Sequence, residues 1–389
     1  MDTSVILKPG KEKPLLHRHH WIFSGAVDRF PSFTDGDLLP VCSHDGRHLG
    51  SGYFNRKSGI VGRMLSFDST LPLEALENSL AKALEYRKDL FVNSETNVYR
   101  LINGEGDGLP GLIIDRYNDL LVLQVSTLGI DKLKPFIVKW LLKHLQPKSI
   151  YERSHLPSRK EEGLKEFSGF LYGKEIPIVE VQENGIRYTI DLIKGQKTGF
   201  FCDHREMRKM IGQMSKGKRV LNCFAYSGGF TLAAMAGGAK HVDTVEISAS
   251  ALEQAKENVQ LNGYPLIPES FFQSDVFEFL RDKPLDYDIV ILDPPAFAKR
   301  QKDIIAACRG YKEINRVAMQ KMPPGSWLLT CSCSYHVDEA LFQKVLFQSA
   351  VEAGRKVRIV QKHILAADHP INLCHPESDY LKSFLLYLE

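Results

Sequence analysis

Short apolar segments with strand character alternate with amphipathic, helix-like segments from Arg219 to residue 389. Seven strands are predicted, and helical patterns separate the first six, which is typical of a doubly wound, mostly parallel α/β sheet. The last connection passes through Pro370 and Pro376 without a helical pattern, so strand seven is expected to run antiparallel to its neighbours. The predicted strands lie near residues 219–223, 241–246, 270–274, 287–292, 326–332, 355–363 and 380–388.

The first of these strands runs into a glycine turn, Ser227-Gly228-Gly229, which is followed by a helix of small residues. Because glycine has no Cβ, both glycines let a ligand lie against the backbone and can adopt φ > 0. The helix that starts near Gly229 also offers unpaired N–H groups to an acceptor. Alone, such a turn is equally compatible with plain packing.

Carboxylates follow the next three strands. Glu246 ends the second strand about twenty residues after the turn, where α/β folds place an acid that accepts both ribose hydroxyls. Asp275 follows the third strand and Asp293-Pro294-Pro295 follows the fourth. Because the carboxyl ends of parallel strands meet at one edge of a sheet, these side chains predict a single nucleoside-shaped site there.

A dinucleotide-binding dehydrogenase would need the G-x-G-x-x-G pattern after strand one, and this chain has only Ser-Gly-Gly and adds a seventh strand. These departures favour the sheet of S-adenosylmethionine (SAM) methyltransferases, whose order of residues the chain resembles. The glycine turn would hold the methionine moiety, Glu246 the ribose, and Asp275 with Val276 the adenine. The predicted cofactor contacts in this region are Tyr226, Ser227, Gly228, Gly229, Glu246, Ile247, Asp275, Val276 and Asp293.

Residues 4–67 are predicted to form a small β-barrel, because short apolar runs are separated by Asp-Gly turns at residues 35–36 and 45–46. The segments 20–25 and 49–55 resemble a PUA domain of the kind fused to bacterial ribosomal RNA methyltransferases. That family usually has proline where this chain has His20 and Arg56. A basic strip is expected to contact RNA phosphates. It consists of Lys8, Lys11, Lys13 and Arg18.

Thr70 and Pro72 predict a domain boundary, with Thr70 as the cap and Pro72 as the first residue of a helix. Strands 98–103, 112–117 and 120–125 follow, whereas the charged segment 154–168 is expected to be mobile or disordered.

Asp203 and Glu206 resemble a capping box that opens a helix. The predicted domains are residues 1–70 (PUA-like), 71–185 (central α/β, positioning RNA) and 186–389 (catalytic).

Seven cysteines without a C-x-x-C pair fit neither a disulfide framework nor a zinc finger, so reduced thiols are expected. The histidines at 17, 19 and 20 lack partners at ligand spacing, and no metal site is predicted. No apolar run reaches the ~18 residues of a membrane helix. We therefore expect a cytoplasmic protein with no membrane partner, whose oligomeric state stays open, a homodimer being one option.

The whole chain resembles RlmI-like methyltransferases, which make 5-methylcytosine in large-subunit (23S) ribosomal RNA. The resemblance rests on residues 195–201 with Asp203 and Arg205, on residues 224–230, on the Asp-Pro-Pro-Ala-Phe segment 293–297 and on the Thr-Cys-Ser-Cys-Ser segment 330–334. In that family the Lys-Thr-Gly-Phe segment lies beside SAM. The resemblance therefore implies that Thr198, Phe200, Phe201 and Arg205 contact the cofactor, and that the partner is unassembled ribosomal RNA.

Carbon 5 of cytosine is a poor nucleophile, so its methylation requires a thiolate that first adds to carbon 6. Strand five ends with two candidates, Cys331 and Cys333, at the sheet edge where ligands of α/β folds bind. We predict Cys333, because it lies beyond the strand and aligns with the Ser-Cys-Ser of the family. A cationic or dipolar neighbour is also required to favour the thiolate, and the sequence does not identify it.

Asp293 is predicted to hydrogen-bond the target base, with Pro294 or Pro295 exposing a carbonyl to the exocyclic amine and Phe297 stacking on the ring. Two alternatives stay open. Asp-Pro-Pro-x-Phe also resembles the loop of amino-group methyltransferases, and related domains methylate guanine, neither of which needs a thiol. The second alternative is a non-catalytic RNA-binding assembly factor that retains affinity for SAM.

Overall fold

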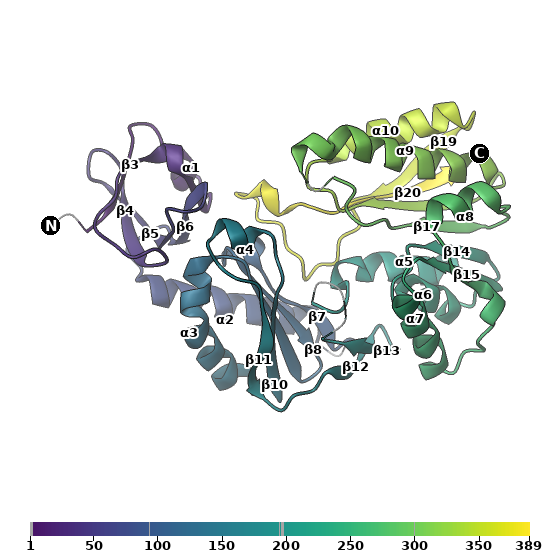
Figure 1. The fold of residues 1–389 in the computed structure, drawn as a ribbon, viewed down its shortest axis with the longest axis horizontal. Helices are drawn as coiled ribbons and strands as arrows, with labels where there is room; N and C mark the ends of the chain where they lie inside the picture. The colour runs from purple at the N-terminus through teal and green to yellow at the C-terminus, as the bar shows by residue number, and fades with distance from the viewer. Residues whose placement is uncertain (1–2, 93, 194, 196–197, 299) are drawn as a thin grey trace. The chain divides into compact units, whose positions relative to one another are not determined.

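The computed structural model describes residues 3–92, 94–193, 195, 198–298 and 300–389, which separate into two compact units (Figure 1). The first unit comprises Met1–Val181, Ile190–Cys202 and Ala367–Asp379. The second comprises Gln182–Thr189, Asp203–Ala366 and Tyr380–Glu389. Each unit is described by itself below, and the predicted boundaries at residues 70 and 185 stay predictions.

In the described residues, the second unit holds a seven-stranded sheet with the order β16-β15-β14-β17-β18-β20-β19. Strands β14 to β18 pair in parallel, and β20 runs antiparallel to β18 and β19, as the prolines before it predict. The doubly wound α/β fold is therefore confirmed. The strands are β14 (Arg219–Cys223), β15 (His241–Glu246), β16 (Phe271–Gln273), β17 (Ile289–Leu292), β18 (Trp327–Ser332), β19 (Val357–Lys362) and β20 (Lys382–Leu388).

Helices cover both faces of this sheet because its central strands are apolar on both sides. Along β17, Val290 and Leu292 pack with α8, α9 and α10, whereas Ile289 and Ile291 pack with α5 and α6 on the opposite face (Figure 1). This alternation is the period-2 geometry of a strand. The helices are α5 (Arg205–Met214), α6 (Gly229–Ala236), α7 (Ala249–Leu261), α8 (Val276–Asp282), α9 (Ile304–Lys321) and α10 (Glu339–Glu352).

The described part of residues 3–67 forms a six-stranded sheet with the order β2-β6-β5-β4-β1-β3. Four of these strands, β1, β4, β5 and β6, match predicted apolar runs, whereas β2, β3 and a short helix were not predicted. The elements are β1 (Val5–Leu7), α1 (Lys13–Leu16), β2 (Trp21–Phe23), β3 (Val27–Arg29), β4 (Leu38–Cys42), β5 (His48–Phe54) and β6 (Ile60–Ser66).

The rest of the first unit is built on a five-stranded sheet of described residues, with the order β11-β10-β9-β8-β7. Its core includes Tyr53 and Leu65 of the N-terminal sheet, so the two sheets share one apolar cluster. The Tyr53 hydroxyl donates to the Pro110 carbonyl at 2.8 Å. The elements are α2 (Pro72–Leu90), β7 (Val98–Asn103), β8 (Leu112–Tyr117), β9 (Leu120–Val125), α3 (Leu128–Leu145), β10 (Ser149–Ser154), α4 (Ser158–Glu161) and β11 (Phe167–Gly173).

The segment 154–168 is ordered, and the expectation of disorder was wrong. Its two buried charges have partners: Arg159 donates to the Val125 carbonyl at 2.7 Å, and Glu162 lies 2.8 Å from the Arg63 guanidinium. Charged side chains are seldom buried unless paired, and partners this distant in sequence leave no local pattern. The segment therefore contributes α4 and the start of β11 to the fold.

Two predicted helix caps were also wrong. Leu71, not Thr70, occupies the N-cap position of α2, and no side chain caps that helix end. Helix α5 begins after His204 without a side-chain cap, because the Asp203 carboxylate is bonded to His204 and Tyr380 instead. The predicted Asn184-Gly185 hairpin is present as β12 (Ile178–Glu183) and β13 (Ile186–Asp191).

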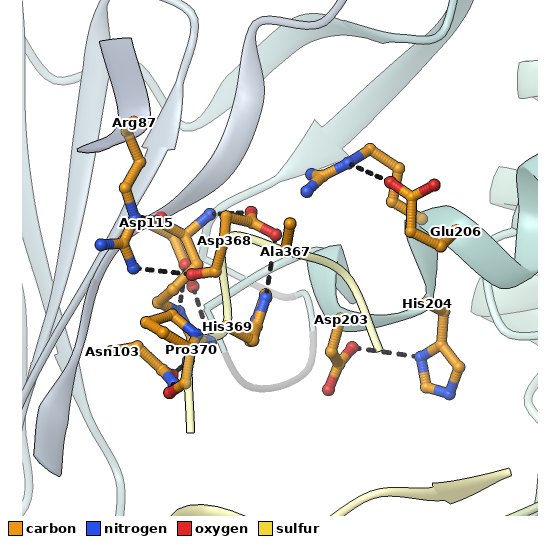
Figure 2. A network of polar contacts seen from close by, with 12 residues as sticks. Arg87, Asn103, Asp115, Asp203, His204, Glu206, Ala367, Asp368, His369 and Pro370 are labelled. Atoms are coloured by element: carbon orange, nitrogen blue, oxygen red, sulfur yellow. Dashed lines mark hydrogen bonds and ion pairs between the residues drawn. The ribbon is translucent and has the colours of Figure 1, made fainter. Parts of the chain in front are cut away.

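The segment 367–379 belongs to the first unit and is anchored there by polar contacts. Asp368 accepts hydrogen bonds from Arg87 at 2.7 Å and from the Arg100 N–H at 2.8 Å, and Figure 2 shows the first of these. Further along, the ring of His375 lies 4.5 Å from those of His19 and Trp21. His375 is fully buried, and neither of its ring nitrogens hydrogen-bonds another described residue.

We predict that acid destabilises the protein through His375. Burial lowers the pKa of His375, and the nearby His19 and His20 add to this, while Glu105 and Glu377 oppose it. Below pH ~6.5 the unfolded chain therefore binds a proton at His375 that the folded chain does not bind. Each unit by which folding lowers this pKa reduces the free energy of unfolding at acid pH by about 1.4 kcal/mol. Unfolding free energy should fall as pH drops from about 6.5, and less steeply in His375→Gln.

Denaturant titrations between pH 5 and 8 would measure this slope. The exposed His44, replaced by Gln, is the matched control and should leave the slope as in the natural protein. An identical pH slope in His375→Gln and the natural protein would contradict the prediction.

No helix in the described part of the chain is both long and apolar enough to cross a membrane.

Candidate active site

The turn between β14 and α6 has a left-handed backbone at three described positions. Gly228 has φ 82°, and the non-glycine residues Phe224 and Tyr226 have φ 57° and 48°. A Cβ on Gly228 would also lie 2.9 Å from the Ala255 Cβ, so this position requires glycine, whereas Gly229 opens α6 with ordinary helical geometry. Left-handed non-glycine residues cost about 1–3 kcal/mol each and cluster at functional sites.

Glu246 holds this strained turn in place. Its Oε2 accepts the Tyr226 N–H at 2.9 Å, and its Oε1 accepts the Ser248 N–H at 2.9 Å. A carboxylate has about four lone-pair sites, so each oxygen keeps acceptor capacity for the two hydroxyls of a ribose. Such charge-assisted bonds contribute ~1.5–3 kcal/mol each. The geometry therefore fits the ribose role that the sequence predicts.

The predicted adenine residues lie at the same edge of the sheet. Ile247 follows β15 and is 64% exposed, so its side chain is accessible at this edge of the sheet. Asp275 caps α8 by accepting the Glu278 N–H at 3.2 Å through Oδ1, and Val276 beside it is buried in the core. One oxygen of Asp275 is thus engaged in capping, which the sequence prediction did not include.

Asp293 ends β17 and takes part in a chain of polar contacts. His204 is bonded through Nε2 to Asp293 Oδ1 at 3.1 Å and through Nδ1 to Asp203 Oδ1 at 3.1 Å, the second of which Figure 2 shows. The Tyr380 hydroxyl donates to Asp203 Oδ2 at 2.5 Å. Asp293 remains partly accessible, with 22% of its side chain exposed, whereas His204 is buried.

The two carboxylates decide the charge of His204. Burial alone would lower the pKa of His204, but the negative charges of Asp293 and Asp203, and the hydrogen bonds to both, raise that pKa well above its ordinary value. At neutral pH the ring is therefore an imidazolium that donates both N–H groups.

Two cysteines lie at the end of β18 in different surroundings. Cys331 is completely buried within the strand, beside Met207, and burial raises its pKa to about 12, with Asp293 adding to the effect. Cys333 lies beyond the strand, is half-buried, and its thiol points to the Pro294 carbonyl at 3.8 Å. Of these two thiols, that of Cys333 is the more accessible.

Ser334 and Lys382 hold the Cys333 loop against the Asp293 loop. The Ser334 hydroxyl accepts the Ala298 N–H at 3.0 Å and contacts the Tyr311 hydroxyl at 2.8 Å. The Lys382 ammonium is buried on β20 and donates to the carbonyls of Ser334 and Tyr380, both at 2.7 Å. The buried ammonium of Lys382 is therefore hydrogen-bonded to the backbone of Ser334, the residue that follows Cys333.

The other residues predicted to contact the base, Pro294, Pro295 and Phe297, differ in how exposed they are. Pro294 is buried and Pro295 is exposed, so the loop presents Pro295 outward. Phe297 is half-buried, and its ring packs 4.6 Å from that of Tyr311 and 5.9 Å from that of Phe277. The structure thus gives Phe297 a packing role, and stacking on a base stays a prediction.

The Thr-Gly-Phe-Phe segment lies in the first unit. The Thr198 hydroxyl donates to Asp115 at 2.6 Å, and the Phe200 N–H donates to the Tyr117 hydroxyl at 3.1 Å. Phe201 follows half-buried, and Gln196 and Lys197 of the same motif lie outside the described residues. Arg205 belongs to the second unit, where it is buried beside Glu206.

The four side chains of the basic strip also lie in the first unit, and all are exposed: Lys8, Lys11, Lys13 and Arg18. Sequence reasoning missed His204, Ser334, Tyr380 and Lys382. Of these, His204 and Ser334 lie within quoted motifs, but nothing in the sequence indicates that His204 meets Asp293 or that Lys382 meets the Cys333 loop.

Comparisons with known proteins agree with this geometry. Residues 155–366 match the family model described as S-adenosylmethionine-dependent methyltransferase, and residues 5–67 match the PUA-like domain. Ribosomal RNA large subunit methyltransferases I from Aliivibrio fischeri and Aeromonas salmonicida are both 41% identical, over 99% of this chain and 99% of theirs.

Two solved structures share the fold. A candidate SAM-dependent methyltransferase from Streptococcus mutans matches with a TM-score of 0.82 and 23% identity, over 99% of this chain and 100% of that one. The methyltransferase structure of SMU.776 complexed with SAH matches with a TM-score of 0.83 and 24% identity, over the same shares.

Proposed function

Because the chain belongs to the family of SAM-dependent methyltransferases of large-subunit ribosomal RNA, we propose that it forms 5-methylcytosine in that RNA through Cys333. The observation that carries the proposal is the position of the Cys333 thiol, which lies 3.8 Å from the carbonyl of Pro294, the residue that follows Asp293. Methylation of an amino group or of guanine needs no thiol at this place.

The residues at the sheet edge fit SAM. Glu246 presents a carboxylate fixed by two backbone amides, and Gly228 adopts the left-handed φ of 82° that the turn requires. When bound, the cofactor supplies an electrophilic methyl group on a sulfonium. Phe224 and Tyr226 keep the turn in the shape that such a ligand requires, and Ile247 offers an apolar surface to the adenine.

The thiolate of Cys333 adds to carbon 6 of the cytosine, which shifts the ring electrons toward carbon 5 and nitrogen 3. Asp293 would stabilise nitrogen 3 as this charge develops by delivering a proton to it, and a carbonyl of Pro294 or Pro295 would accept from the exocyclic amine. Lys382 is the buried cation that favours the Cys333 thiolate. Its ammonium donates at 2.7 Å to the carbonyl of Ser334, the residue that follows Cys333. After methyl transfer, loss of the carbon-5 proton expels the thiolate.

A direct test combines methyl-labelled SAM with ribosomal RNA from a strain that lacks the gene. The proposal expects label in the RNA and 5-methylcytosine in the nuclease digest, at a position that mass analysis can map. Label in a methylated guanine or in an N-methylated base would overturn the carbon-5 assignment and leave the enzyme class intact.

The proposed substrate is an RNA polymer, unassembled large-subunit RNA in the cytoplasm, whose target base leaves its stack at a cost of a few kcal/mol. Predicted phosphate contacts come from the basic strip Lys8, Lys11, Lys13 and Arg18. Reversing these four charges to Glu should weaken RNA binding and flatten its salt dependence by ~0.7 in log–log slope for each phosphate that the strip no longer neutralises.

Filter-binding at several salt concentrations measures that slope. The matched control reverses four exposed lysines of the second unit, Lys209, Lys216, Lys240 and Lys344, and should change the slope less. Equal slopes for the natural protein and the basic-strip variant would refute the assignment of these residues.

A further inference from the structure

The buried ring of His204 is surrounded by polar groups. Its ring lies between two carboxylates, 3.1 Å from Asp293 on one side and 3.1 Å from Asp203 on the other. The Cys331 thiol also faces the ring, with its sulfur within 4.8 Å of ligand atoms of His204 and Asp293. The ring of Phe230 also lies near that of His204, with ring centres 6.0 Å apart.

These surroundings exclude a plain packing residue. A buried imidazolium is costly unless its donors are satisfied, and here both N–H groups meet carboxylates. Asp203 is in turn held by the Tyr380 hydroxyl at 2.5 Å, so the acid behind His204 is itself oriented. Asp293 is the member of this chain that remains accessible, with 22% of its side chain exposed. A proton on His204 thus has a short path to the base site through Asp293.

We infer that His204 is a positioning residue that orients Asp293 and lends it the proton which nitrogen 3 of the cytosine takes up. The inference rests on the proposed carbon-5 chemistry. When the Cys333 sulfur bonds to carbon 6, the π pair of carbons 5 and 6 moves into the bond between carbons 4 and 5, and the π pair between carbon 4 and nitrogen 3 moves onto nitrogen 3. The Asp293 carboxylate takes the Nε2 proton of His204 and passes it to nitrogen 3, which leaves Asp293 ionised and His204 neutral.

Protons and electrons balance when the methylated base is released from Cys333. The bond between carbon 5 and the methyl group forms as the bond from that methyl to sulfur breaks, and the carbon-5 proton then leaves to solvent. Nitrogen 3 returns its proton through Asp293 to His204, and the bond between sulfur and carbon 6 breaks to restore the thiolate. Thus His204 and Cys333 end in their starting states, and one proton is released in each turnover.

The test is the pH profile of single-turnover methyl transfer for His204→Gln, which retains a donor toward Asp293 but cannot ionise. The inference expects a loss of rate of about 10²-fold near neutral pH, at the lower end of general-acid effects. It also expects the basic decline of the natural profile to disappear, with SAM affinity within about two-fold of normal. Tyr380→Phe is the matched control, because it perturbs Asp203 without removing a titrating ring and should keep the basic decline.

A rate loss in His204→Gln that is uniform with pH, with the basic decline retained, would overturn the inference and indicate a structural role. Should this variant fail to fold, selective ¹⁵N-histidine NMR of the natural protein and Asp293→Asn decides. A drop in the pKa of His204 in Asp293→Asn supports the inference, and an unchanged pKa overturns it. The product is analysed in the same reactions: absence of 5-methylcytosine from the natural enzyme's RNA would instead refute the proposed function.

Discussion

Cys333→Ala should abolish methyl transfer to ribosomal RNA while SAM still binds. Without the sulfur nothing adds to carbon 6, and loss of a nucleophile lowers rates by at least about 10⁴-fold in enzymes that depend on one. Steady-state incorporation of labelled methyl measures the loss, and isothermal titration should give a SAM affinity within about two-fold of the natural value.

The matched control for this prediction is Cys331→Ala, two residues earlier on β18. Cys331 is buried against Met207 and its high pKa keeps it a thiol, so its replacement should leave transfer largely intact and cost about 1 kcal/mol of stability. Normal turnover of Cys333→Ala would instead favour an amino-group or guanine product.

Asp293→Asn is expected to lower the rate of transfer by about 10²- to 10⁴-fold, the range found for positioned acid–base groups. Asparagine has the same shape and can still accept from His204, so the fold should persist while the carboxylate charge beside nitrogen 3 is lost. Single-turnover kinetics at saturating SAM separate this effect from cofactor binding.

Asp275→Asn is the matched control, because it makes the same chemical change at the end of another strand. Asp275 caps α8 and is proposed to contact adenine, so its variant should raise the KM for SAM and largely preserve the rate at saturation. If both variants lowered the saturated rate equally, Asp293 would have no special role at the base.

The alternating pattern after Arg219 predicted the second unit well because its information is local. Strand β17 is apolar at every position, as a strand buried on both faces must be, and the prolines before β20 indicated its reversed direction. The same holds for β7, β8 and β9, whose bounds agree with the predicted segments. Such elements are visible in sequence because their period and their breakers lie within a few residues.

The failures involve partners distant in sequence. Segment 154–168 looked disordered because its charges are satisfied by Arg63 and by the Val125 carbonyl, which local composition does not reveal. The capping box was wrong because Asp203 bonds Tyr380, which lies 177 residues away. The left-handed Phe224 and Tyr226 were missed because φ > 0 is expected of glycine.

In the candidate site, too, the residues predicted from the sequence are those with a local signal, and the residues missed are those brought in by distant contacts. Glu246, Asp275, Asp293 and Cys333 were predicted because each follows a strand that the sequence pattern identifies. His204 and Lys382 reach the site from α5's start and from β20, and only the folded chain brings them to Asp293 and to the Cys333 loop. Cys333 was chosen over Cys331 from the sequence, and this choice stays a prediction. In the structure β18 ends at Ser332, so Cys331 is buried within the strand and Cys333 lies beyond it.

Covalent trapping tests the central claim most directly. RNA that carries 5-fluorocytosine at the mapped position is incubated with enzyme and SAM, because fluorine on carbon 5 prevents the release step and preserves the sulfur–carbon bond. The account predicts a stable adduct whose peptide map places the nucleotide on Cys333. A methylated product without any adduct, or an adduct on a residue other than Cys333, would contradict it.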